Sequence, residues 1–208
     1  MKIGKPFPLG IFGQRLATNS SQEHSNKGGF MEIYEALKKD HVELKQLLNE
    51  LIALKDDDDY RYVLVEEIRN ALVPHSRAEE SVFYNTLRAV NADKKIVFHG
   101  YQEHMEAEGL LRTLQVMDKM NMGWRAVATK LLEAVSHHIQ EEETEIFAEA
   151  RKVFTSEEAI AMCEAFEELK PKVLKEGFLG TTADMVINLM PPRLADSIRN
   201  FGQGHQSH

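Results

Sequence analysis

The chain has 208 residues, 25 of them basic and 33 acidic, for a formal net charge of −8. This length suits one domain with appendages, and a hydrophobic content of 43% is sufficient for a packed core. The acidic balance argues against nucleic acid as a partner. The chain has one cysteine, Cys163, which excludes an intramolecular disulfide. No apolar run is long enough for a membrane span. The first residues lack the apolar segment of a signal peptide, so we expect a cytoplasmic protein.

Helical periodicity dominates the middle of the chain. Residues 1–29 are rich in Gly, Ser, Asn and Pro and show no period, which predicts an irregular arm. From residue 30 to residue 153 the apolar residues recur at helical spacing, and no stretch alternates as a strand would. We expect the second helix to continue, with a kink, through Pro74. The four helices predicted between the polar breaks cover residues 30–54, 60–89, 94–120 and 123–153.

The remaining residues, 154–208, form a predicted helical extension and tail. Thr155 and Glu158 have the spacing of a capping box, which predicts a fifth helix that ends near Pro171. One further short helix is expected over ADMVINLM, followed by two prolines and a polar tail. The predicted fold class is therefore all-α: an up-down-up-down four-helix bundle over residues 30–153, with an irregular N-terminal arm and C-terminal accessory helices.

An internal repeat carries histidines and glutamates. When the chain is shifted by 63 residues, 40–51 lies over 103–114 and 75–84 lies over 138–147, so each half reads His and, 34 residues later, His-x-x-x-Glu. Residues i and i+4 share a helix face, and residues equidistant from a helical hairpin's turn lie at one height. The turn positions therefore bring one set of side chains to one level of the bundle: His41, His75, Glu79, His104, His138 and Glu142.

Four imidazoles and two carboxylates in a helical core require a cation, because unpaired buried carboxylates are strongly destabilising or take up protons. Six donors exceed the four of a structural zinc and suit two ions, each held by two histidines, with both glutamates bridging. Iron or manganese fits nitrogen and oxygen donors best, and zinc and copper remain alternatives. The adjacent Glu80, Glu141 and Glu143 are expected on a solvated face, unless they hydrogen-bond the ligand histidines.

This pattern resembles the hemerythrin-like, His-His-Glu cation-binding family over residues 30–153. The resemblance is carried by the two histidine–glutamate motifs, the two earlier histidines and the acidic residues that follow each motif. It implies a four-helix bundle with a non-haem di-iron centre, containing two iron ions that are oxo- or hydroxo-bridged, with manganese or zinc as alternatives. In this centre His41 and His75 would hold one iron, His104 and His138 the other, and Glu79 and Glu142 would bridge.

One departure from the family pattern bears on function. Classical oxygen-carrying members have a fifth histidine on the third helix, four residues from the other one. Here Gly100 and Glu108 stand four residues either side of His104, and His99 is out of phase. The departure argues against simple reversible oxygen carriage.

We therefore expect a protein that binds or senses dioxygen or a related small ligand, such as peroxide or nitric oxide. One alternative is a di-iron stress-response or iron–sulfur repair enzyme, so the sequence leaves enzymatic activity open. Another is an iron-responsive interaction module, in which residues 154–208 dock on the bundle or form a homo-oligomer contact. The expected partner is a small diatomic ligand such as dioxygen, and neither nucleic acid nor a membrane.

Overall fold

The structure is a computed structural model that describes residues 30–90, 94–119, 123–176 and 183–203. Every element in these ranges is helical and no strand occurs among them, so the predicted all-α class is confirmed. The expected N-terminal arm, residues 1–29, lies outside the described residues, as does the end of the expected polar tail, residues 204–208. Of the helices described, none combines the length and the apolar composition that a membrane span requires.

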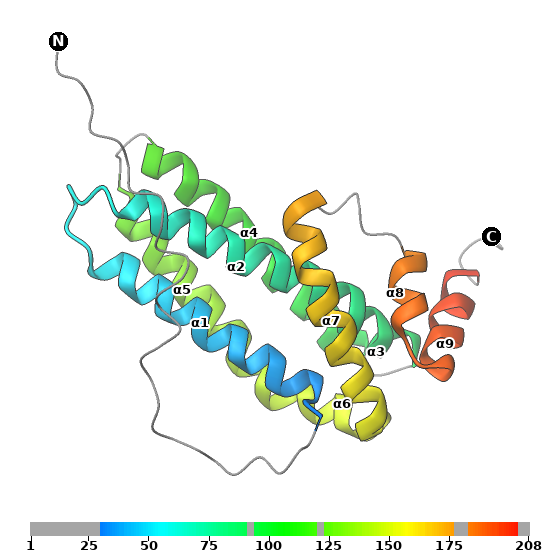
Figure 1. The fold of residues 1–208 in the computed structure, drawn as a ribbon. Coiled ribbons are helices and arrows are strands. Elements are labelled where there is room, and N and C mark those ends of the chain that lie inside the picture. The colour runs from blue at the N-terminus through cyan, green and yellow to red at the C-terminus, as the bar shows by residue number, and fades with distance from the viewer. Residues whose placement is uncertain (1–29, 91–93, 120–122, 177–182, 204–208) are drawn as a thin grey trace. The chain divides into compact units, whose positions relative to one another are not determined.

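Four long helical segments correspond to the four predicted over residues 30–153 (Figure 1). The second and fourth each contain a five-residue π-helical turn, labelled η, in which the helix widens before it continues. The segments are α1 (Ile33–Ala53); α2 (Arg61–Glu79), η2 (Glu80–Tyr84) and α3 (Asn85–Ala89); α4 (Lys94–Lys119); and α5 (Trp124–Glu141), η3 (Glu142–Ile146) and α6 (Phe147–Val153). Helix α1 packs against α2 and α5, and α4 packs against the same two helices.

Helix α2 continues through Pro74, so the predicted continuity is confirmed and the kink stays a prediction. A proline inside a helix removes one backbone hydrogen bond and destabilises by about 3 kcal/mol. Leu72 and Ala78, on either side of it, are both buried in the protein core. Packing of the flanking turns therefore maintains the helix that carries His75 and Glu79.

The apolar stripe of α1 shows how a polar residue enters the core. Ile33, Leu37, Leu44 and Leu48 follow helical spacing and are each at most 4% exposed. His41 occupies the place in this stripe between Leu37 and Leu44, and it is 1% exposed. The spacing that buries the leucines thus also directs the His41 imidazole inward.

Two separate apolar clusters form the core. The turn-side cluster lies toward the α1–α2 connection and the start of α5, and it includes Leu48, Leu51, Leu64, Ile68, Leu111, Leu114 and Leu131. The extension-side cluster reaches the helices that follow α6, and it includes Ile33, Leu37, Val82, Phe83, Ile146, Phe147 and Phe166. Between them the long helices contribute polar side chains instead of apolar ones.

Helix α7 (Ser156–Glu176) packs against α1 and α2. The predicted capping box is present: the Thr155 backbone N–H donates to Glu158 Oε2 at 3.0 Å, and the Glu158 N–H donates to Thr155 Oγ1 at 3.2 Å. The expectation that this helix ends near Pro171 is wrong, because α7 continues to Glu176. Val173, beyond the proline, is buried, so packing extends the helix past the lost hydrogen bond.

Two short helices follow α7 in the described residues. Helix α8 (Ala183–Leu189) corresponds to the predicted apolar helix, whereas α9 (Pro192–Gln203) occupies part of the segment expected as a polar tail. Pro192 is the first residue of α9, a position where proline needs no donor and its fixed φ favours a helix. Leu194 and Ala195 are buried, and the Arg193 Nη2 donates to Glu158 Oε2 at 2.6 Å, which ties α9 to the start of α7.

Candidate metal centre

A layer of six polar side chains separates the two apolar clusters. Its members come from α1, α2, α4, α5 and the first residue of η3, and each is at most 7% exposed. The six residues of this layer, here called the inner layer, are His41, His75, Glu79, His104, His138 and Glu142. The structure thus brings together all six residues that the repeat singled out, and their role as metal ligands stays a prediction.

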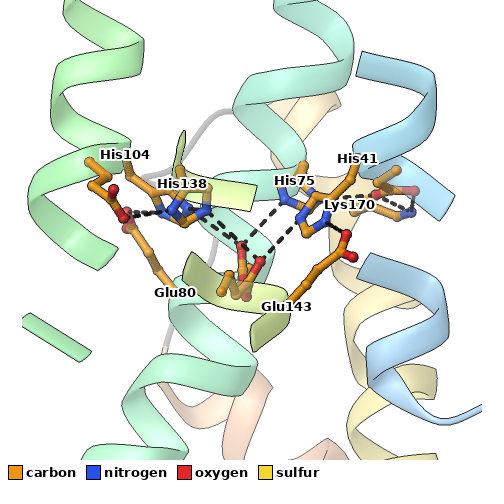
Figure 2. Close-up of polar contacts among 11 residues, drawn as sticks. His41, His75, Glu80, His104, His138, Glu143 and Lys170 are labelled. Carbon is orange, nitrogen blue, oxygen red and sulfur yellow. Dashed lines mark hydrogen bonds and ion pairs between the residues drawn. The ribbon is translucent and has the colours of Figure 1, made fainter. Parts of the chain in front are cut away.

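The histidines of the inner layer form two pairs. The ring centroids of His41 and His75 lie 5.1 Å apart, and those of His104 and His138 lie 4.6 Å apart. Figure 2 shows the four labelled imidazoles directed toward one another from different helices. This pairing is the one that the family resemblance implies for two ions.

Each glutamate of the inner layer contacts one histidine of each pair. Glu79 Oε2 lies 3.3 Å from Nε2 of His75 and 3.4 Å from Nε2 of His104. Glu142 Oε2 lies 3.1 Å from Nε2 of His41 and 3.9 Å from Nε2 of His138. Both carboxylates therefore connect the two histidine pairs.

The other ring nitrogen of every histidine faces a carboxylate outside the inner layer (Figure 2). An ionised carboxylate only accepts, so each Nδ1–H donates, and Nε2 of a neutral ring keeps its lone pair for a cation. Carboxylates in this position fix the ring orientation of metal-binding histidines. The pairs are His41 with Glu143 at 2.9 Å, His75 with Asp40 at 3.3 Å, His104 with Glu80 at 3.1 Å, and His138 with Glu103 at 3.0 Å.

These four outer carboxylates obey the same repeat as the inner layer. Asp40 and Glu103 are related by the 63-residue shift, as are Glu80 and Glu143. The sequence interpretation did not assign Asp40 and Glu103 a role, although each directly precedes a histidine of the set. It expected Glu80 and Glu143 on a solvated face unless they bonded histidines, and the structure shows that they do.

A π-helical turn follows each His-x-x-x-Glu motif. Glu79 is the last residue of α2 before η2, and Glu142 is the first residue of η3. Such turns are rare and occur frequently at functional sites, because the wider turn changes which residues face inward. Here the two turns start where consecutive glutamates contact opposite nitrogens of one imidazole ring, Glu79 and Glu80 at His104 and Glu142 and Glu143 at His41.

The two inner carboxyls have opposite electrostatic character. Burial, reinforced by the charge of Glu79, raises the pKa of Glu142 well above its usual range. Burial also acts on Glu79, but contacts with Glu142, His104 and His75 hold the pKa of this carboxyl well below its usual range. In the metal-free protein Glu142 therefore favours its protonated form beside an ionised Glu79.

Within each histidine pair the pKa values of the two rings are shifted in opposite directions. Burial and the neighbouring His75 lower the pKa of His41 well below its usual value, and burial and His104 lower that of His138. Burial also opposes charging of the other two rings. Nevertheless, Asp40 and Glu79 raise the pKa of His75, and Glu79 and Glu80 raise the pKa of His104 to about 9. In the metal-free protein, protons thus supply part of the positive charge that the inner layer needs.

Unpartnered buried atoms test whether a cation fits this layer. Both oxygens of Glu79, both oxygens of Glu142 and Nε2 of His41 are buried without a hydrogen-bond partner among the described residues. A buried polar group left in this state destabilises a protein by about 1–3 kcal/mol. The Nε2 atoms of His104 and His138 also face each other at 3.1 Å, a contact of two lone pairs unless a cation or proton intervenes. The donor set therefore fits bound metal cations.

The place of the missing fifth histidine is taken by Tyr84. A Cβ atom at Gly100 would lie 2.7 Å from the Tyr84 hydroxyl, so only glycine leaves room for this ring. The Tyr84 ring stacks on His104 with centroids 5.4 Å apart and 11° between planes. Its hydroxyl is buried without a hydrogen-bond partner among the described residues. The tyrosine thus occupies the face of α4 one turn before His104.

Comparison with known proteins places this geometry in a family. The model of the hemerythrin HHE cation-binding domain matches residues 32–150, a range that contains the complete inner layer. The chain belongs to this family. The resemblance stated from the sequence is therefore confirmed, and family membership implies that this HHE domain binds metal cations, typically iron.

Two similar proteins show how far the likeness extends. A crystal structure of a hemerythrin HHE cation-binding domain-containing protein from Mycobacterium kansasii matches with a TM-score of 0.60 at 22% identity, covering 75% of this chain and 98% of that one. At this identity the likeness concerns the fold. A protein named DNA nickase from Nostoc sp. is 25% identical over 171 residues, which are 79% of this chain and 44% of that protein. The chain thus spans less than half the length of this relative.

Helix α7 lies beyond the matched HHE domain and yet reaches the inner layer. The Lys170 ammonium donates to Asp40 Oδ2 at 2.9 Å and Oδ1 at 3.1 Å (Figure 2). Asp40 is the carboxylate that accepts from His75, and the Phe166 ring packs edge-on against the His75 ring at 5.8 Å. The extension therefore adds a cation and an aromatic wall to one half of the inner layer.

Proposed function

We propose that this HHE protein holds two iron ions in its inner layer and binds dioxygen or a related small ligand, such as peroxide or nitric oxide, at that centre. The observation that carries the proposal is that each inner glutamate contacts one histidine of each pair, as a carboxylate shared by two ions would. On this proposal α1, α2, α4 and α5 act as an up-down-up-down bundle whose four walls supply the ligands.

The residues of the chain have separable roles in this proposal. Bound iron supplies a reversible electron change and open coordination positions for a small ligand. The four outer carboxylates hold the imidazoles in the tautomer that presents Nε2 to the centre. The two apolar clusters exclude bulk water from both sides of the layer. The buried Tyr84 hydroxyl would donate a hydrogen bond to a ligand beside His104.

The Tyr84–Gly100 contact also argues against the function of a reversible oxygen carrier. With Tyr84 over Gly100 there is no room for a fifth histidine one turn before His104. Water or peroxide then competes with a bound ligand for the position that remains open. We therefore propose binding, sensing or conversion of the ligand in place of prolonged storage.

Metal analysis and an oxygen cycle test the proposed function. We expect about two iron ions per chain after expression in iron-rich medium, and near-ultraviolet absorption of the aerobic protein. The reduced protein should react with dioxygen, and argon alone should not restore the spectrum of the reduced state. A single tightly bound zinc ion, or no metal after reconstitution, would defeat the di-iron proposal. Several clean cycles between argon and air would instead restore the oxygen-carrier interpretation.

The similarity to a DNA nickase calls for a separate test of DNA-cleaving activity. The matched region is less than half of that relative, and the net charge of −8 disfavours approach to a phosphate backbone. Iron-loaded protein incubated with supercoiled plasmid and Mg²⁺ is expected to leave the plasmid intact. Nicking that disappears in a His104→Ala variant would assign the activity to the inner layer and replace the proposal.

A second candidate function rests on the contact between Lys170 and Asp40. Because α7 reaches His75 through this carboxylate, loading of the His41–His75 half would order α7 and so change what the extension can bind. The protein would then be an iron-responsive interaction module. This function is compatible with ligand binding at the same centre.

Replacing Lys170 by methionine tests this coupling. In the natural protein we expect amide exchange in α7 to slow when iron is loaded, because His75 and Asp40 become fixed. The Lys170→Met variant should lose most of this difference and release one of its two ions faster. The Lys172→Met variant is the matched control, since Lys172 donates to Glu168 within α7 at 2.6 Å. Identical α7 exchange in metal-free and loaded natural protein would rule the coupling out.

A further inference from the structure

A second group of histidines and carboxylates lies on the outer face of α4 and α5. It consists of two further His-x-x-x-Glu pairs, His99 with Glu103 on α4 and His137 with Glu141 on α5. Each pair has the i, i+4 spacing that aims an imidazole and a carboxylate at the same place. The two pairs face each other across adjacent helices, since α4 packs against α5. We call these four residues the outer cluster.

The distances within the outer cluster suit a cation. His99 Nε2 lies 3.1 Å from Glu141 Oε2 and 3.8 Å from Glu103 Oε1, and one ligand atom from each of the three residues lies within 4.8 Å of the others. Ligands at about 2.1 Å from one zinc ion are about 3–4 Å apart in tetrahedral geometry. His137 hydrogen-bonds Glu103 Oε1 through Nδ1 at 3.0 Å, so a fourth residue borders this group of three.

The repeat gives an independent reason to expect positive charge here. Glu103 corresponds to Asp40, and both accept from a histidine of the inner layer. Asp40 also holds the Lys170 ammonium, so its second interaction is with a cation. At Glu103 the second oxygen is Oε1, which lies 3.0 Å from Nδ1 of His137 and 3.8 Å from Nε2 of His99. A metal ion beside Glu103 would stand where the first half has a lysine.

The first half offers no counterpart of the outer cluster. The positions that correspond to His99, His137 and Glu141 under the 63-residue shift are Ala36, Pro74 and Ala78. These residues bear no ligand atoms in their side chains, and α7 packs on this part of α1 and α2. The outer histidines and Glu141 are therefore a feature of the second half alone, where the inner layer is not covered by α7.

Solvent can reach the outer cluster. The side chains of His99 and His137 are 54% and 63% exposed, whereas Glu103 is 10% exposed. Two surface hollows of about 430 and about 410 Å³ both have His99 and Glu103 in their walls. A cation arriving from solution would thus meet the imidazoles first and the shared Glu103 last.

We propose that the outer cluster is a binding site for one divalent cation of the zinc or ferrous class, held by His99, Glu103, His137 and Glu141. Two carboxylates balance its charge, and mixed nitrogen and oxygen donors select this class over calcium or magnesium. Glu103 joins this site to the inner layer, because its Oε2 accepts from His138 while its Oε1 faces the outer cation. The exposed side of the ion keeps water, so it exchanges more readily than metal in the inner layer.

Zinc titration of the iron-loaded protein tests the outer site. We expect the natural protein to bind one Zn²⁺ per chain in addition to its iron, by calorimetry and by metal analysis after buffer exchange. The His99→Ala and His137→Ala variants should each bind this Zn²⁺ at least about tenfold more weakly. Their iron content and absorption spectrum should be unchanged, since neither residue belongs to the inner layer.

A variant of the tail histidines serves as the control, and a zinc soak of crystals locates the ion. The His205→Ala, His208→Ala double variant removes two histidines outside the described residues and should bind the extra Zn²⁺ like the natural protein. Anomalous scattering from zinc-soaked crystals should place the ion between α4 and α5 at Glu103. No extra Zn²⁺ in the natural protein, or equal binding by the His99→Ala and His137→Ala variants, would overturn the outer site. Because iron is measured in the same samples, this outcome is distinct from failure of the inner centre.

Discussion

Replacing Glu142 by alanine is expected to abolish binding of both iron ions. Its carboxylate contacts His41 in one pair and His138 in the other, so its loss removes a ligand from each half of the inner layer. His41→Ala should instead weaken mainly one ion, because His41 belongs to one pair only. Iron per chain, measured after reconstitution and gel filtration, should fall from about two to near zero for Glu142→Ala and to about one for His41→Ala.

Two further variants make this result specific. Glu145→Ala removes an exposed carboxylate from the same π-helical turn and should keep both ions. Glu142→Gln removes the charge but keeps the shape, so it should also lose iron while making the metal-free protein more stable above neutral pH. That gain follows from the raised pKa of Glu142, which shows that its ionised form is unfavourable in the fold. A Glu142→Ala protein with full iron occupancy and a native-like spectrum would show that this carboxylate does not bridge.

The inner layer could be predicted from the sequence because two kinds of spacing agree. The i, i+4 spacing places His75 with Glu79 on one face, and the 63-residue repeat places His138 with Glu142 in the same relation. Equal distances from the turns then set the height of His41 and His104. These are properties of regular helices, so the set of six required no knowledge of how individual side chains pack.

The contacts of the ligand histidines with Glu80 and Glu143 could not be predicted from helix spacing. His41 is held by Glu143 from the other half of the chain, and His104 by Glu80. The glutamates follow Glu142 and Glu79 directly, and in a regular helix a neighbour points about 100° away. The π-helical turns η2 and η3 change that angle locally, and no spacing in the sequence announces a π turn.

The C-terminal helices depart from the sequence prediction for a different reason. Pro171 is a strong local signal for the end of a helix, yet α7 continues because tertiary packing buries Val173 beyond it. The sequence pattern does not predict helix α9, because its segment follows two prolines and is polar overall. Its burial depends on Leu194 and Ala195 meeting the extension-side cluster, a contact between segments distant in the chain. Such contacts have no periodic signature.

Removing the metal is expected to lower the melting temperature by about 10 °C or more, with a larger loss at pH 9 than at pH 7. A ligand that binds only the folded state at 1,000 times its Kd stabilises by about 4 kcal/mol, and 1 kcal/mol shifts melting by about 2–4 °C at this size. The metal-free protein must also bury an ionised Glu79 beside a protonated Glu142.

The pH dependence follows from groups whose pKa is higher in the folded than in the unfolded protein. Such a group stabilises fully below its unfolded pKa, and the contribution is lost as pH rises through its folded pKa. The pKa of His104 is raised to about 9, and those of His75 and Glu142 are also raised, so the metal-free protein loses stability as pH rises from 7 to 9. His41 and His138 have lowered pKa values and act in the opposite sense only below about pH 6.5.

The loaded protein should change less over the same interval, because metal binding has already displaced the protons of its ligands into the solvent. Thermal melts of chelator-treated and iron-loaded protein are followed by circular dichroism at pH 7 and pH 9. They measure the loss of melting temperature on metal removal and its dependence on pH. The difference between the two melting temperatures should widen at pH 9 in the natural protein. It should widen less in Glu142→Gln, where one titrating carboxyl is absent, although His104 still contributes. Equal melting of both forms, or a difference that narrows toward pH 9, would contradict a buried metal layer held by these residues.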